Sequence, residues 1–194
     1  TGQPLKTSIS GLVSDLSIGS SVFNNILING RTNNDRFTGN ISSNNKKLIF
    51  DLNGFIDYST ELKSAKFNLD LDNLQIDIDK SFKAGLNINL AGTSIEDITG
   101  SILFSDSNYT TNKKIYSFKE LKVLSFFENN ERVTKFNSPT VINGFIKGDL
   151  DIKKLRFDFE ESIKYNIYEK NFSDITSSKV STTFEFNIYS DLVS

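Results

Sequence analysis

An all-β fold built from antiparallel strands is the fold class that this sequence of 194 residues predicts. Apolar and polar residues alternate with a period of two along most of the chain, which places the apolar side chains on one face of an extended strand. Clusters of Asn, Ser, Asp and Gly interrupt this alternation at short intervals, as turns do between antiparallel strands. A single segment near the C-terminal end has helical spacing instead.

The clearest alternation lies in Lys66–Ile78, which reads KFNLDLDNLQIDI. A helix would scatter these apolar residues around its axis, so the whole stretch is predicted to be extended. After Asn73 the phase of the alternation slips by one residue. The slip predicts a β-bulge or a tight bend at this point.

The same pattern predicts strands on both sides of this stretch. A hairpin tip is predicted at 32–35, a turn at 42–45, a polar loop at Ser105–Lys114 and a further turn at 128–131. The predicted strands are Ile9–Ile18, Ile26–Arg31, Phe37–Ile41, Leu48–Ile56, Leu86–Leu90, Ile102–Phe104, Tyr116–Phe127, Val133–Phe136, Val141–Ile152 and Thr183–Tyr189.

The tetrapeptide NGFI occurs twice, at Asn53–Ile56 and again at Asn143–Ile146. Chance could produce so short a match, and we use it only as an indication of repeated units.

An amphipathic helix is predicted at Arg156–Tyr168. Apolar residues recur there every four positions, at Phe159, Ile163 and Ile167. Glu160 also precedes Lys164 by one turn, the favourable order for a charge pair on a helix.

Composition excludes several function classes. The chain has neither Cys nor His, so it lacks thiolate chemistry, disulfides, the usual general base and the commonest metal ligand. A net charge of -2 gives no basic surface for nucleic acid, which we do not expect as a partner. No catalytic motif, metal site or cofactor is predicted, and the protein is not expected to be an enzyme.

The chain contains no apolar run near the roughly 20 residues that a membrane-spanning helix needs. It starts at Thr1 without a signal segment, and it contains no Met. We therefore expect residues 1–194 to form one segment of a much longer chain.

Alternating acids are the one pattern that resembles a cation site. They occur at Asp70, Asp72, Asp77 and Asp79, without the glycine turn and terminal Glu of an EF-hand loop. Acids on the solvated face of a strand are the favoured interpretation, and they also discourage aggregation of strand edges.

The apolar stripe of the strands has two interpretations. It lines either the inside of a closed barrel or sandwich, the usual arrangement for such strands, or an open groove. Composition does not separate the two.

Four stretches resemble the C-terminal region of the TamB-like envelope proteins of diderm bacteria. The stretch at 10–58 resembles the module that precedes this region, and Leu150 stands where the family commonly has Phe. The four stretches are ITGSILFSDSNYTT at 98–111, YSFKELKVLS at 116–125, FNSPTVINGFIKGDLDIKKL at 136–155 and SIKYNIY at 162–168.

The resemblance implies a β-taco, in which antiparallel strands form an elongated U-shaped trough with an apolar interior. It implies a parent chain that is anchored in the inner membrane and spans the periplasm. Expected partners are phospholipid acyl chains and an outer-membrane barrel protein of the TamA type, in lipid transport and outer-membrane biogenesis. The family has no catalytic residues to carry over.

The first functional hypothesis is therefore a lipid-conducting bridge segment. Each acyl CH₂ that its groove shields from water avoids roughly 0.8 kcal/mol of exposure. The alternative hypothesis is a structural or adhesive β-repeat with a closed core and no ligand. The predicted groove residues are Leu48, Phe50, Leu52, Phe67, Leu69, Leu71, Leu74, Ile76, Leu86, Ile88 and Leu90.

Overall fold

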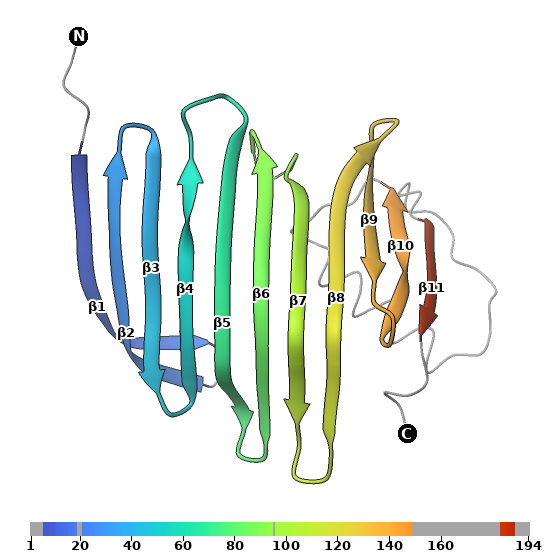
Figure 1. Cartoon of the computed structure of the whole chain (residues 1–194), viewed down its shortest axis with the longest axis horizontal. Helices are drawn as coiled ribbons and strands as arrows, with labels where there is room; N and C mark the ends of the chain where they lie inside the picture. Colours follow the sequence, from blue (N-terminus) through green and yellow to red (C-terminus); the bar gives the residue numbers. More distant parts are fainter. Residues whose placement is uncertain (1–5, 19–20, 95, 149–182, 189–194) are drawn as a thin grey trace.

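The computed structural model describes residues 6–18, 21–94, 96–148 and 183–188, and every regular element in these ranges is a β-strand. Each strand pairs antiparallel with the next one in sequence, so the sheet is a single meander (Figure 1). Strands β1 and β11 lie at opposite ends, and the sheet is not closed. The strands are β1 (Lys6–Ile18), β2 (Ser21–Asn33), β3 (Arg36–Asn45), β4 (Leu48–Asp57), β5 (Lys63–Asp77), β6 (Lys80–Gly92), β7 (Thr99–Thr110), β8 (Ile115–Glu128), β9 (Glu131–Asn137), β10 (Ile142–Gly148) and β11 (Thr183–Ile188).

The predicted all-β class and the antiparallel pairing are confirmed. The predicted helix at Arg156–Tyr168 lies outside the described residues, as does the end of the strand predicted at Val141–Ile152.

Two segments that were predicted as a turn and a loop are wholly or mostly strand. The turn predicted at 42–45 belongs to β3, whose last residue, Asn45, pairs with Leu48. The loop predicted at Ser105–Lys114 is strand as far as Thr110, because β7 keeps its pairing with β8. Polar residues dominate both strand ends, so the alternation disappears from the sequence although the backbone ladder continues.

The predicted slip in β5 is a β-bulge. The register between β5 and β6 shifts between Leu71 and Leu74, and the register with β4 shifts opposite the same site. Leu71 belongs to the buried apolar cluster, and Leu74 packs against the same cluster. Residues three apart in a regular strand face opposite sides, so the bulge is what brings both leucines to one side.

Cross-strand pairing sorts the side chains onto two faces, because directly paired residues point to the same side of a sheet. Rows of apolar residues cross successive strands on one side, which we call the apolar face. Polar residues dominate the other side, the polar face. One row of the apolar face consists of Ile28, Ile41, Leu52, Leu69, Leu86, Phe104 and Leu121.

Glycine explains the repeated tetrapeptide NGFI. Gly54 pairs with Phe67 on the next strand, and a Cβ at Gly54 would lie 2.6 Å from the Phe67 ring and 2.1 Å from the Lys66 carbonyl oxygen. Gly144 pairs with Phe136 in the same way. Both copies therefore place a glycine opposite a phenylalanine on the neighbouring strand, as in the covering of strand glycines by aromatic rings.

The tip of the β1–β2 hairpin leaves the plane of the sheet. In Figure 1 the lower ends of β1 and β2 turn sharply and cross the lower ends of the neighbouring strands. Asn25 has a left-handed backbone with φ of 58°, and Phe23 and Ile26 on either side of it are both buried. These two residues form the core cluster with Leu48 and Leu71 of β4 and β5.

Candidate functional site

The apolar face is the candidate functional site. The register and the apolar packing place ten of the eleven predicted groove residues on it. The remaining one, Ile76, is 52% exposed near the end of the β5–β6 hairpin. The ten are Leu48, Phe50 and Leu52 on β4, Phe67, Leu69, Leu71 and Leu74 on β5, and Leu86, Ile88 and Leu90 on β6.

Burial divides these ten residues into two groups. Leu48 and Leu71 are buried, at 8% and 9% exposure, because Phe23 packs against them. The other eight are only half-buried. Within the described ranges, the apolar face is thus buried at Leu48 and Leu71, near the β1–β2 tip, and half-buried at the other eight positions, including those on β6.

The sequence prediction missed part of this surface. Ile41 lies in the same row as Leu52, while Ile102 and Phe104 continue the rows of Ile88 and Leu86 onto β7. The alternation of Ile102 and Phe104 in the sequence is a signal that could have added both to the predicted groove residues. No alternation in the sequence marks Phe23 as part of this surface, because the left-handed Asn25 interrupts the regular strand next to it.

A loop between β6 and β7, described at 93–94 and 96–98, borders the apolar face at its other end. Arg132 of β9 holds this loop: its guanidinium donates hydrogen bonds to the carbonyl oxygens of Glu96 and Ile98 and, at 2.9 Å, to Ser125 Oγ. The side chain is 4% exposed and lies 4.6 Å from the centre of the Phe127 ring. Burial lowers the pKa of Arg132, although it remains a cation at neutral pH.

Asp97 forms hydrogen bonds within the same loop. Its carboxylate accepts hydrogen bonds from the Thr93 hydroxyl at 2.6 Å, from the Ser94 backbone N–H at 2.6 Å and from the Thr93 backbone N–H at 3.0 Å. These donors hold the pKa of Asp97 well below its usual range. The loop is therefore fixed from within by Asp97 and from β9 by Arg132.

A small apolar cavity of about 280 Å³ lies beside this loop. Ile56, Ala65 and Leu90, which form one row of the apolar face, line it together with Ile98 of the loop. The loop thus adds a wall to one end of the apolar face.

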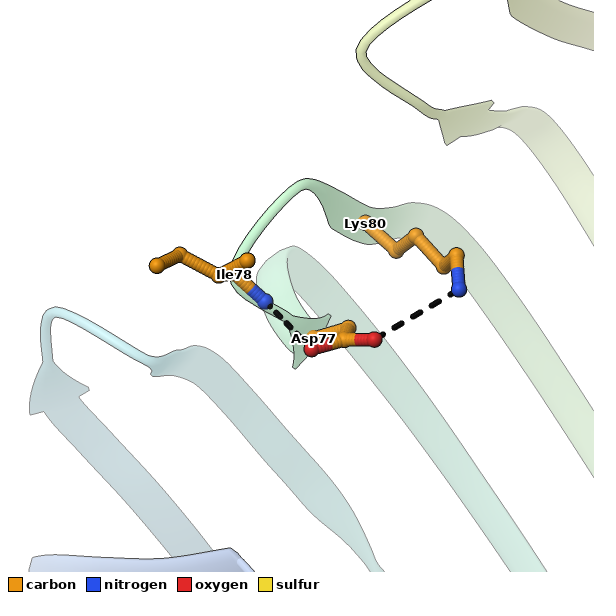
Figure 2. A network of polar contacts seen from close by, with 3 residues as sticks. All are labelled: Asp77, Ile78 and Lys80. Carbon is orange, nitrogen blue, oxygen red and sulfur yellow. Dashed lines mark hydrogen bonds and ion pairs between the residues drawn. The ribbon is translucent and has the colours of Figure 1, made fainter.

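The acidic residues of β5 do not assemble a cation site. Asp72 forms an ion pair with Lys83 at 3.3 Å. Figure 2 shows Asp77 at the β5–β6 turn, where it accepts a hydrogen bond from the Ile78 backbone N–H at 2.8 Å and pairs with Lys80 at 3.5 Å. In the described ranges no group of acidic side chains could hold a metal ion.

Among the described residues, no helix is long and apolar enough to cross a membrane. Comparison with protein-family models, curated proteins and solved structures finds no match to this chain.

Proposed function

We propose that this chain is a groove segment of a TamB-like envelope protein and shields phospholipid acyl chains as they cross the periplasm. The observation that carries the proposal is a single-layer sheet with one continuous apolar face, most of whose residues are half-buried and have no second layer over them within the described ranges. A water-soluble domain normally covers such a face with a second layer.

Acyl chains fit the chemistry of this face. Its two central rows, which run through Leu52 and through Phe67, contain only aliphatic, phenylalanine and glycine residues on β4 to β7, so a hydrocarbon chain there meets no side chain that requires a hydrogen bond. Each methylene that leaves water on this face contributes roughly 0.8 kcal/mol.

The proposal includes a U-shaped trough in the parent protein. The sheet edges at β1 and β11 would continue into neighbouring segments, and the curved sheet would enclose the acyl chains. The parent chain would be anchored in the inner membrane and would meet an outer-membrane barrel protein of the TamA type, as the resemblance implies.

The competing hypothesis is a structural or adhesive β-repeat with a closed core. It requires the apolar face to be covered from all sides. The sheet is not closed, and most residues of the apolar face are half-buried rather than buried. Both observations favour the lipid hypothesis.

The test uses a pair of adjacent substitutions on β6. Leu86→Arg places a charge on the half-buried part of the apolar face, and the matched control Asn87→Arg places the same charge on the exposed polar face. Leu71 is unsuitable, because it is buried beneath Phe23.

We expect Leu86→Arg to keep the melting temperature of the wild-type chain and to lose most of the phospholipid that is extracted with the purified protein. Asn87→Arg is expected to change neither. Unchanged phospholipid in folded Leu86→Arg would contradict the proposal, and so would an unfolded Leu86→Arg beside a folded Asn87→Arg, since that result indicates a closed core.

A further inference from the structure

A row of asparagines crosses the polar face. The register aligns one Asn from each of the five consecutive strands β2 to β6, and the row resumes on β9, β10 and β11 after Leu103 and Lys122 interrupt it on β7 and β8. The five consecutive members are Asn29, Asn40, Asn53, Asn68 and Asn87.

The fold does not explain this row. Asparagine is depleted in β-strands, and Ser or Thr would keep the face equally soluble. If the row served only to join neighbouring strands, each Asn side chain would form a hydrogen bond with the next Asn. Among these five residues one such hydrogen bond occurs, from Asn87 Nδ2 to Asn68 Oδ1 at 2.7 Å. Asn40 and Asn53 instead both donate to Asp51.

The amides therefore retain free hydrogen-bonding groups. Each Asn amide offers two N–H donors and a carbonyl acceptor. Among the described residues, Asn68 has no acceptor for its Nδ2 group, and the Oδ1 atoms of Asn53 and Asn87 receive no hydrogen bond. Both donors and acceptors are thus left along the row, which suits a ligand whose hydroxyl groups both donate and accept.

A depression of about 940 Å³ lies over this row. All five asparagines line it, together with Ser8 and Ser10 of β1. Five strands span about 19 Å, since neighbouring strands lie 4.7–4.9 Å apart. The depression is therefore long enough for several sugar units rather than for a single small molecule.

The charged residues that line the depression are both cations, Arg31 and Lys66. Neither forms an ion pair within the described ranges, and Asp51 lies outside the lining. Arg36 covers the Phe55 ring at 3.6 Å, so recognition here depends on hydrogen bonds and charge rather than on stacking against that ring.

We propose that this depression binds an acidic glycan, which lies across β2–β6 on the polar face. Its hydroxyl groups exchange hydrogen bonds with the asparagine row, and its carboxylates pair with Arg31 and Lys66 by charge-assisted hydrogen bonds. The site is on the opposite side of the sheet from the apolar face, so it does not depend on the lipid proposal.

The test is isothermal titration calorimetry of the full chain with oligogalacturonate. A malto-oligosaccharide of equal length provides the uncharged comparison, and inorganic phosphate provides the small anion. Asn68→Ala and Lys66→Gln are the test variants. Asn137→Ala is the matched control, because Asn137 lies in the same row on β9 but does not line the depression.

We expect wild type and Asn137→Ala to bind oligogalacturonate equally and in preference to both comparison ligands. Asn68→Ala and Lys66→Gln should each weaken binding, Lys66→Gln by roughly tenfold for the loss of one charge-assisted hydrogen bond. Absence of oligogalacturonate binding, equal binding of phosphate or malto-oligosaccharide, or equal weakening by Asn137→Ala would overturn the proposal. Circular dichroism melts establish that each variant is folded.

Discussion

Two charged residues, Arg132 and Asp97, fix the loop that borders the apolar face. The buried guanidinium of Arg132 donates hydrogen bonds to two backbone carbonyl oxygens of the loop. Without Arg132, these oxygens would lose those hydrogen bonds. Asp97 satisfies backbone N–H groups within the loop. Both residues act on the backbone, so the loop can keep its shape while its exposed side chains vary.

Asp97 should make this loop sensitive to acid. Its folded-state pKa lies below the ordinary value of 3.8, so its contribution to stability is present above pH 3.8 and is lost as the pH falls through the folded pKa. We expect Asp97→Asn to lower the melting temperature at neutral pH, and the difference from wild type to shrink below pH 3.8. Thermal melts over this pH range provide the measurement.

Asp70→Asn is the control for this experiment, because Asp70 is exposed and accepts no hydrogen bond among the described residues. It should leave the melting temperature unchanged. A difference between Asp97→Asn and wild type that stays constant down to the lowest pH would contradict the assigned role of the carboxylate.

The residue-level roles were the least predictable from the sequence. Arg132 contacts a loop more than thirty positions away, and its partners are backbone carbonyls, which carry no sequence signal. That ten of the predicted groove residues share one face was predictable, because alternation alone decides which side chains share a face. Ile76 is the exception. It continues the alternation of β5, but it lies near the β5–β6 turn and is 52% exposed.

At the scale of elements, the hairpin tip of β1 and β2 covers one end of the apolar face. Phe23 is 3% exposed and joins the tip to Leu48 and Leu71. The tip also forms hydrogen bonds through Asn24, which donates to Asp15 at 2.7 Å and accepts from Asn45 at 3.0 Å. Apolar packing by Phe23 is the larger contribution.

Phe23→Ala should release the tip. Removing a buried phenylalanine side chain costs about 3–5 kcal/mol, and this loss should appear as faster amide hydrogen exchange in residues 21–26. Val22→Ala is the matched control, because Val22 is 46% exposed and should change stability by no more than about 0.5 kcal/mol. Equal exchange in the two variants would show that Phe23 does not hold the tip.

Elements were predicted well wherever one face is apolar. The bulge in β5 follows directly from the phase slip after Asn73, because the apolar residues must return to the same face. Strand ends were predicted poorly, as in β7, where polar residues on both faces hide the period. The bend in β2 depends on the left-handed backbone conformation of Asn25. Asn tolerates this conformation, but an Asn in the sequence does not predict it.

At the scale of the whole molecule, the sheet has two faces of different chemistry and few buried residues between them. The described strands form one layer (Figure 1). The register places the apolar rows of β2 to β8 on one side of it and the asparagine row on the other. Alternation predicted this division, but no local pattern could predict that the sheet stays open, because closure depends on contacts between distant strands.

Site-specific photo-crosslinking along β6 is the measurement that tests the central claim most directly. A photoreactive amino acid is placed in turn at Leu86, Asn87, Ile88 and Asn89 of the full-length protein in its native membranes. We expect phospholipid adducts at Leu86 and Ile88 and almost none at Asn87 and Asn89, because successive residues of a strand face opposite sides. Equal labelling at all four positions, labelling confined to the two asparagines, or no labelling at any position would contradict a lipid-carrying apolar face.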